Sequence, residues 1–175
     1  MKRWIVFLPL VVLAGLALLF AGYALKHDPT VKPAAMVGKP APDITLPQLA
    51  DGPPLKLREA LQGKPAFVNL FASWCAPCIV ENPALMAMEA QGARIIGIAY
   101  EDEPHASKLF LTKHGNPFAE VLTDRDGRAG IEFGISGVPE TFLVGKDGVI
   151  IAKHIGPLTP DVADDMMEKA EAAAR

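Results

Sequence analysis

The chain has 175 residues, which is enough for one compact domain with a full core but short for two. Half of its residues are hydrophobic, and many of them lie in one uncharged run near the N-terminus. Without Lys2 and Arg3, which precede that run, the chain carries 15 basic and 20 acidic residues, and this acidic balance argues against binding to nucleic acid phosphates.

The uncharged run covers residues 4–25, which is 22 residues. As a helix it measures about 33 Å, and the hydrocarbon core of a bilayer is about 30 Å thick, so we predict a transmembrane anchor. Lys2 and Arg3 keep residues 1–3 in the cytoplasm by the positive-inside tendency, which sends the rest of the chain across the membrane. A cleaved signal peptide is the alternative, with Gly22-Tyr23-Ala24 as a poor cleavage site. Both readings place the folded domain outside the cytoplasm.

Residues 26–36 are predicted to be a linker, because this part of the chain is rich in proline and lacks apolar periodicity. The folded domain is predicted to cover residues 37–175. It begins with two short apolar pieces, 44–46 and 55–57, separated by Asp51-Gly52-Pro53-Pro54, which indicates a hairpin or two edge strands.

From residue 66 onwards, predicted strands alternate with predicted helices. Residues 66–72 are apolar on both faces, as is typical of a central strand covered by helices. The later predicted strands are 93–100, 118–122, 141–144 and 149–154, and the predicted helices end near Glu89, His114, Phe133 and Ala174. Gly145-Lys146-Asp147-Gly148 indicates a hairpin between the last two strands. The order predicts an α/β fold: a mixed sheet with parallel central strands, an antiparallel hairpin edge and helices on both faces.

The segment Phe71-Ala72-Ser73-Trp74-Cys75-Ala76-Pro77-Cys78 holds the only two cysteines of the chain. A zinc site needs about four ligands, and the four histidines match no paired spacing, so we predict no metal. Haem attachment needs a histidine directly after the second cysteine, where this chain has Ile79. A purely structural disulfide closing so short a loop removes little entropy from the unfolded chain. The pair is therefore predicted to be redox-active.

The expected position of Cys75 at the start of a helix explains how it could react. Unpaired backbone N–H groups and the helix dipole favour its thiolate there. Lowering a thiol pKa from about 8.5 to about 7 raises the thiolate fraction at neutral pH from about 3% to about half. Cys78, one turn further and predicted to be more buried, can attack the mixed disulfide that an accessible Cys75 forms.

At this point the sequence resembles a known family. Residues 71–78, Pro83 and the later Gly137-Val138-Pro139-Glu140-Thr141-Phe142 are similar to the thioredoxin fold. The chain most resembles the membrane-anchored thiol:disulfide interchange proteins of cytochrome c maturation, called CcmG or DsbE, which are related to TlpA-type reductases. Three further segments carry this likeness: Val37–Asp43, Gly97–Glu103 and Gly115–Phe118. The resemblance covers about residues 36–160, and it implies a thioredoxin-like fold with an N-terminal strand extension and a central insert at 97–103.

The resemblance also implies further site residues. Val138–Pro139 is expected to be a cis peptide facing the cysteines, with the backbone of Val138 pairing with the substrate chain. Glu81 and Glu140 match acidic positions that tune the thiol pKa and proton movement in this family, and a carboxylate near Cys75 would oppose its thiolate. Trp74, beside the attacking cysteine, could serve packing alone or contact the substrate backbone.

Asn69 departs from general thioredoxin, which has a buried aspartate for proton transfer six positions before the first cysteine. Asparagine cannot take a proton. Either Glu81 or Glu140 does that work, or the enzyme is slow towards general substrates.

The implied function is a disulfide reductase in the periplasm, held by a single-pass anchor in the inner (cytoplasmic) membrane. Its implied substrates are the CxxCH disulfide of apocytochrome c or an assembly partner thiol protein, with electrons from a membrane donor of the DsbD/CcdA type. No cofactor is expected beyond the reversible Cys75–Cys78 disulfide. Two alternatives stay open: a general TlpA-like reductase of exported proteins, and a non-catalytic module that holds apocytochrome. The motif does not fix the direction of electron flow, because potentials in this fold span about −270 to −120 mV.

Overall fold

A computed structural model describes residues 7–24 and 36–174 of the chain. The chain divides into two compact units, Met1–Lys32 and Pro33–Arg175, which we describe separately. The predicted cytoplasmic tip at 1–3 and residues 26–35 of the predicted linker lie outside the described residues.

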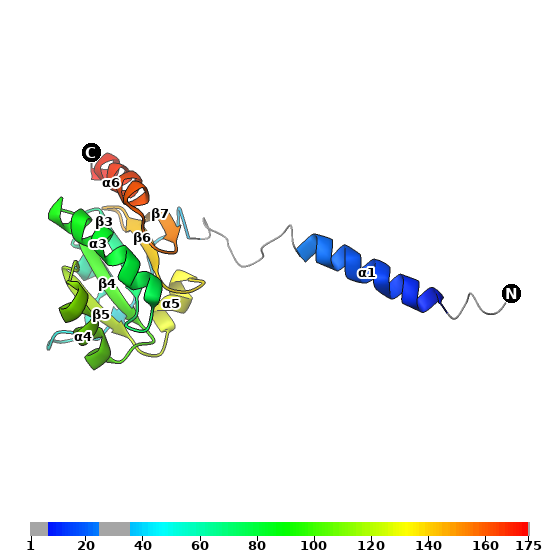
Figure 1. Ribbon diagram of the computed structural model, residues 1–175. Coiled ribbons are helices and arrows are strands. Elements are labelled where there is room, and N and C mark those ends of the chain that lie inside the picture. Colours follow the sequence, from blue (N-terminus) through cyan, green and yellow to red (C-terminus); the bar gives the residue numbers. More distant parts are fainter. Residues whose placement is uncertain (1–6, 25–35, 175) are drawn as a thin grey trace. The chain divides into compact units, whose positions relative to one another are not determined.

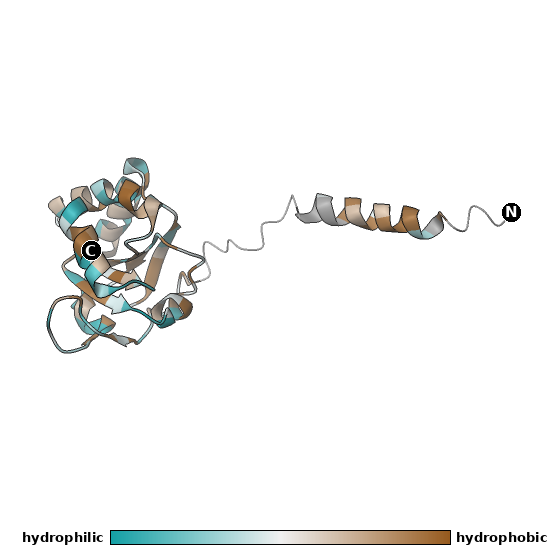
Figure 2. Cartoon of the chain, turned by 60° about the horizontal axis from the view of Figure 1, so that its bottom comes forward, coloured by the Kyte–Doolittle hydropathy of each residue, from teal (hydrophilic) through white to brown (hydrophobic). Residues whose placement is uncertain are grey.

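The described part of the first unit is one apolar helix, α1 (Leu8–Ala24, 17 residues). It carries no charged residue, and those of its large side chains that the structure describes are exposed, including Leu10, Leu13 and Leu18. Figure 2 shows apolar colouring along most of its coloured turns. Among the helices within residues 7–24 and 36–174, none combines the length and the apolar character needed to cross a bilayer. The predicted span of 4–25 starts and finishes outside the described residues.

The second unit is built on a five-stranded mixed sheet with strand order β5-β4-β3-β6-β7 (Figure 1). The central β3 pairs in parallel with β4, which pairs in parallel with β5, while β6 and β7 run antiparallel on the other side. The strands are β3 (Ala66–Phe71), β4 (Ile95–Tyr100), β5 (Glu120–Asp124), β6 (Glu140–Val144) and β7 (Ile150–Ile155). The predicted α/β order and the antiparallel hairpin edge are confirmed.

Helices cover both faces of this sheet, because successive side chains of a strand point to opposite faces. Phe67 and Phe71 face the cluster that includes side chains of α3, α4 and α6, whereas Val68 and Leu70 face the cluster formed with α2 and α5. The helices are α2 (Leu57–Leu61), α3 (Ala76–Ala90), α4 (Pro104–His114), α5 (Arg128–Phe133) and α6 (Pro160–Ala174). Only the short α2 was not predicted.

An N-terminal extension precedes the sheet, as expected. Its short strands β1 (Thr45–Leu46) and β2 (Leu55–Lys56) pair antiparallel, which confirms the predicted hairpin. One bridge joins Pro40 to Val149, and another joins Gln48 to Leu122 on β5. The extension therefore supplies partners to backbone groups at the β5 edge that would otherwise be open to other chains.

Several predicted boundaries differ from the structure; the predicted strand 93–100, for example, begins at Ile95. The expected insert at 97–103 is not a separate element, because residues 97–100 pair within β4 and only 101–103 form the turn to α4. Strand β5 begins at Glu120 rather than at Phe118. Asn116 Oδ1 accepts a hydrogen bond from Phe118 N at 3.1 Å, and the Phe118 ring stacks on Phe71 with centroids 4.9 Å apart. These contacts hold the residues before Glu120 outside the regular strand.

Candidate active site

The cysteine turn joins β3 to α3. Cys75 is the N-cap residue of α3, and its Sγ accepts a hydrogen bond from Cys78 N at 3.1 Å. This is the predicted contact between the sulfur and a free N–H group at a helix start. Cys75 and Cys78 are joined by a disulfide, so the structure shows the oxidised state of the pair.

The predicted contrast in exposure between the two cysteines is not seen. Cys75 is 3% exposed and Cys78 is 2% exposed. The carbonyl oxygen of Val138 lies 3.5 Å from Cys75 Sγ and helps to cover it. The Val138–Pro139 peptide is cis, which confirms that prediction. The loop before β6 therefore faces the cysteines.

Exposed apolar side chains lie on both sides of the cysteine pair in the sequence. Trp74 is 59% exposed, and Ile79 and Val80 in the first turns of α3 are exposed as well. Trp74 Nε1 donates a hydrogen bond to the carbonyl of Glu101 at 3.2 Å, which orients the indole. A single exposed apolar residue needs no explanation, but three beside a reactive disulfide suit contact with a polypeptide substrate. The contacts support both readings of Trp74, packing and substrate contact.

Asp102 holds the cysteine turn in place, a role that the sequence did not reveal. Its carboxylate accepts hydrogen bonds from Ser73 N at 2.8 Å, from Ser73 Oγ at 2.7 Å and from Ser107 Oγ at 2.7 Å. Glu103 N donates a fourth at 3.0 Å. In the sequence, Asp102 lies in the segment 97–103 that carries the family resemblance, and no role was predicted for it. Its contact with Ser73 depends on β3 and β4 lying side by side.

Glu81 lies one turn beyond Cys78 on α3 and is fully buried. Asn69 Nδ2 donates to Glu81 Oε1 at 3.0 Å, and Leu158 N donates to Glu81 Oε2 at 3.1 Å. Burial raises the pKa of Glu81 from 4.5 to about 7, and these two hydrogen bonds, which favour the carboxylate, oppose the rise only in part. Glu81 can therefore take up and release a proton near neutral pH.

Glu140, the first residue of β6, is buried beside the loop that carries Val138. Its Oε1 accepts hydrogen bonds from Ser136 N and Ser136 Oγ, both at 2.7 Å, and its Oε2 lies 2.7 Å from Lys153 Nζ. Lys153 therefore balances the charge of Glu140, and the hydrogen bonds of Glu140 go to Ser136 in the loop before β6. Lys153 was not among the predicted site residues. Whether Glu140 also tunes the thiol pKa stays a prediction.

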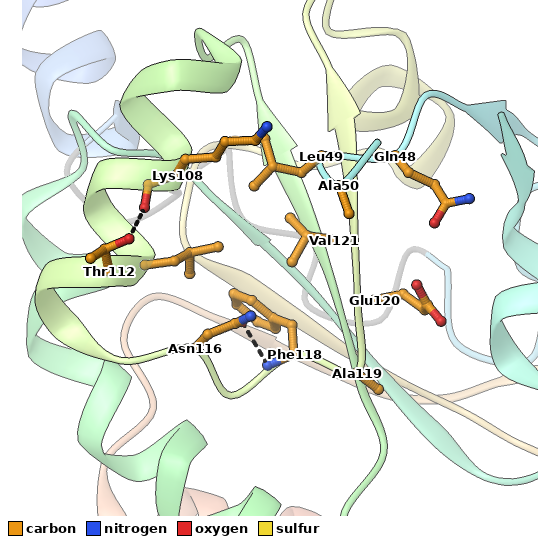
Figure 3. A pocket seen from close by; sticks show the side chains of 11 residues that line it. Gln48, Leu49, Ala50, Lys108, Thr112, Asn116, Phe118, Ala119, Glu120 and Val121 are labelled. Carbon is orange, nitrogen blue, oxygen red and sulfur yellow. Dashed lines mark hydrogen bonds between the residues drawn. The ribbon is translucent and has the colours of Figure 1, made fainter. Parts of the chain in front are cut away.

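A cavity of about 460 Å³ lies at the β5 edge of the sheet. Figure 3 shows Leu49, Phe118 and Val121 around its apolar part and Lys108 on α4 near its rim. Its lining, all within residues 48–121, includes none of Trp74, the two cysteines or Val138. The cavity is therefore separate from the redox site.

Comparisons with known proteins agree with this site. The profile of the Redoxin family matches residues 36–172. The thiol:disulfide interchange protein HelX of Rhodobacter capsulatus is 39% identical over 164 residues, covering 93% of this chain and 92% of that protein. The thiol:disulfide interchange protein DsbE of Pseudomonas aeruginosa is 42% identical over 158 residues, covering 89% and 86%.

A solved structure extends the comparison to the fold. The crystal structure of a thiol:disulfide interchange protein of the thioredoxin family from Chlorobium tepidum matches with a TM-score of 0.61 and 28% identity, covering 75% of this chain and 94% of that one. The fold is thus thioredoxin-like, and with its cysteine pair joined as a disulfide the chain is a thiol-disulfide oxidoreductase. By family match, relatives and site geometry, the chain belongs to the Redoxin family and, within it, to the DsbE/HelX thiol:disulfide interchange proteins.

Proposed function

We propose that the chain reduces disulfides in exported polypeptides, namely the CxxCH segment of apocytochrome c or a thiol protein of cytochrome c assembly. The observation that carries this proposal is the position of Cys75 at the α3 N-terminus, where Cys78 N donates to its sulfur and the Val138 carbonyl lies 3.5 Å away. A thiolate is favoured there. Val138, beside it, offers backbone groups to an extended substrate.

The reaction has two exchange steps. The Cys75 thiolate attacks one sulfur of the substrate disulfide, which forms a mixed disulfide and releases the other substrate sulfur as a thiolate. Cys78 then attacks Cys75 Sγ, which releases the second substrate thiolate and forms the Cys75–Cys78 disulfide. Two electrons pass to the substrate. The oxidised pair in the structure is the product state of this reaction.

The proton of Cys78 needs an acceptor before its attack, and Glu81 is the group that we propose for it. Its pKa of about 7 lets it exist in both states at neutral pH. Asn69 Oδ1 is buried and has no hydrogen-bond partner among the described residues. In the present orientation, Asn69 Nδ2 donates to Glu81, which suits the ionised carboxylate. If the amide rotates by half a turn, Asn69 Oδ1 can instead accept a hydrogen bond from the protonated carboxyl group. Asn69 can therefore form a hydrogen bond with Glu81 in either protonation state.

We further propose that the redox unit works in the periplasm, tethered to the inner membrane by residues 4–25. The uncharged helix α1, its exposed side chains, and Lys2 and Arg3 before it support an anchor with that orientation. A membrane donor of the DsbD/CcdA type would then return two electrons to the Cys75–Cys78 disulfide. No other cofactor is part of this proposal.

A Cys78→Ser variant of the full-length chain tests the exchange with a polypeptide. The variant is first reduced and then mixed with an oxidised CxxCH peptide. It should accumulate a peptide adduct on Cys75, because the resolving sulfur is missing. Mass spectrometry measures the adduct, and Cys75→Ser is the control that should form none through position 75. Undiminished peptide binding and function with both cysteines replaced would instead support the holding module.

The reduction potential separates the proposed reductant from an oxidant. A value near −270 mV is expected, and a value near −120 mV with ready oxidation of unfolded proteins would contradict the proposal. Equal rates with CxxCH and unrelated disulfide peptides would favour the general TlpA-like reductase.

A further inference from the structure

Lys153 on β7 carries a buried positive charge with three contacts. Its side chain is 2% exposed, and the side chain of its partner Glu140 is 1% exposed. Besides Glu140, the Lys153 ammonium donates to the carbonyl of Gly134 at 3.2 Å and lies 5.1 Å from the centroid of the Phe142 ring. Phe142 and Lys153 face each other across the β6–β7 register. The ammonium is therefore fully enclosed by β6, β7 and the loop before β6.

Such a pair is a poor device for stability. Removing two charges from water is costly, and well-packed apolar residues of similar volume often stabilise a fold at least as well. The geometry of the pair indicates a different benefit. Glu140 accepts two hydrogen bonds from Ser136, and Lys153 donates one to the carbonyl of Gly134. Both partners thus hold the same loop, residues 134–139.

This loop presents Val138 to the disulfide. Its far end is fixed by the hydrogen bond from Gly156 N to the Pro139 carbonyl at 2.9 Å. Between the fixed points, Val138 is half-buried, and its carbonyl lies 3.5 Å from Cys75 Sγ. Within the described residues, Val138 makes no backbone hydrogen bond. Its side chain packs against both core clusters, and its position relative to Cys75 is set by this packing together with the contacts of its neighbours.

We propose that Lys153 is a positioning residue for polypeptide disulfides: paired with Glu140, it fixes the loop 134–139 so that Val138 meets the substrate backbone beside Cys75. The inference rests on thiol-disulfide exchange at Cys75 and on the substrate-pairing role proposed for Val138. Lys153 does not act on the sulfur chemistry itself, because its charge is balanced by Glu140 and its described contacts run to the loop and to Phe142.

The test compares two substrates in reduced full-length protein. One is an oxidised peptide with a CxxC disulfide, and the other is a small aromatic disulfide without a peptide backbone. Lys153→Met should lower the second-order rate constant for the peptide about tenfold, because a misplaced binding element slows reaction steeply. The rate with the small disulfide and the reduction potential should equal those of the wild type. Lys169→Met, which breaks an exposed pair with Asp165 on α6, is the matched control and should change neither rate.

Two further variants separate positioning from charge balance. Lys153→Met combined with Glu140→Gln leaves no uncompensated buried charge, so its melting temperature should recover towards wild type while the peptide rate stays about tenfold low. Lys153→Arg keeps the charge and a donor for Gly134, and it should restore most of the peptide rate.

A folded double variant with the wild-type peptide rate would overturn the proposal, as would equal losses with both substrates. If neither Lys153→Met variant folds, Ser136→Ala carries the test at an exposed residue. It removes one bond to Glu140 and should slow the peptide alone about threefold; an unchanged peptide rate would count against the pair. Because any CxxC peptide serves, failure of the wild type with a CxxCH peptide alone contradicts the proposed substrate and leaves this test intact.

Discussion

Three buried carboxylates surround the redox site, and each is accommodated in a different way. Burial raises the pKa of Glu81 to about 7, so it is protonated over much of the acidic range. Asp102 is held by four hydrogen-bond donors, and Glu140 by a lysine together with Ser136. With a pKa of about 7, Glu81 can exchange a proton near neutral pH. These contacts agree with the proposed proton exchange at Glu81, and they let Asp102 support the cysteine turn and Glu140 support the loop 134–139.

The raised pKa of Glu81 predicts a pH-dependent stability. The folded chain holds this proton up to about pH 7 and the unfolded chain only up to about 4.5. Its contribution to the free energy of unfolding is therefore full below 4.5 and is lost as the pH rises through 7, about 3 kcal/mol in all. Urea unfolding from pH 4.5 to 8 measures it as the difference between wild type and Glu81→Gln.

The matched control is Glu89→Gln, an exposed position on the same helix. It should keep the wild-type dependence on pH. A Glu81→Gln curve parallel to that of the wild type over this range would show that Glu81 is not the titrating group.

At the scale of elements, β3 decides where the site forms. Its alternation puts Phe67, Asn69 and Phe71 on one face, where α3 and α4 pack. Asn69 meets Glu81 of α3 on one side and, through the β3–β6 register, Thr141 on the other. Phe71, at the end of the strand, stacks on Phe118. The approach to β5 is therefore linked by packing to the strand that leads into the cysteine turn.

Gly97 on β4 tests this packing. A Cβ built there would lie 2.8 Å from two atoms of the Phe118 ring, too close for any side chain. Gly97→Ala should displace Phe118 from Phe71 and lower the free energy of unfolding by about 1–3 kcal/mol, as overpacking does. Denaturant unfolding measures the change, and Gly137→Ala, which meets nothing within 4 Å, is the stability control.

A double-variant cycle tests the reason for that loss. In a Phe118→Leu background, which leaves more room, Gly97→Ala should be less destabilising than in the wild type. Equal losses in both backgrounds would mean that the ring is not the obstacle.

At the scale of the whole molecule, an apolar helix and a redox unit occupy one chain. The redox unit has its own core on both sides of the sheet, and the N-terminal extension pairs with the sheet at Val149 and at Leu122. Helix α1 has no polar face, and a helix that is apolar all round needs either a protein core or a membrane around it. The proposed tether supplies the membrane.

Charges within α1 test the tether. The apolar residues of 4–25 together favour membrane insertion by a free energy on the order of 4–8 kcal/mol. Each arginine at a membrane centre opposes insertion by about 2.5–3.5 kcal/mol, so Leu13→Arg combined with Leu16→Arg should abolish it. The full-length variant should leave the membrane fraction after alkaline carbonate extraction of bacterial cells. Leu109→Arg, at an exposed leucine of α4, is the control and should stay with the membrane. A double variant that also stays would contradict the tether.

Features that depend on neighbouring residues could be predicted from the sequence alone. Periodicity and turn residues defined the order of strands and helices, and this order placed Cys75 at a helix start, because these signals act over a few residues. The family resemblance added Pro139 and its cis bond. Helix α2 and the first residue of β5 were not predicted, because tertiary contacts determine the conformation of such short segments.

Contacts between side chains far apart in the chain depend on how the elements pack, which local sequence patterns do not reveal. Asp102 reaches Ser73 from 29 positions away, and Lys153 meets Glu140 only because β6 and β7 pair in one register. A shift of that register by a single residue would turn Lys153 to the other face. The turn at 145–148 predicts that the two strands pair, but not the register irregularity at Leu143/Val144. The near-equal burial of the two cysteines has the same origin, because the loop that covers Cys75 comes from 63 positions further along the chain.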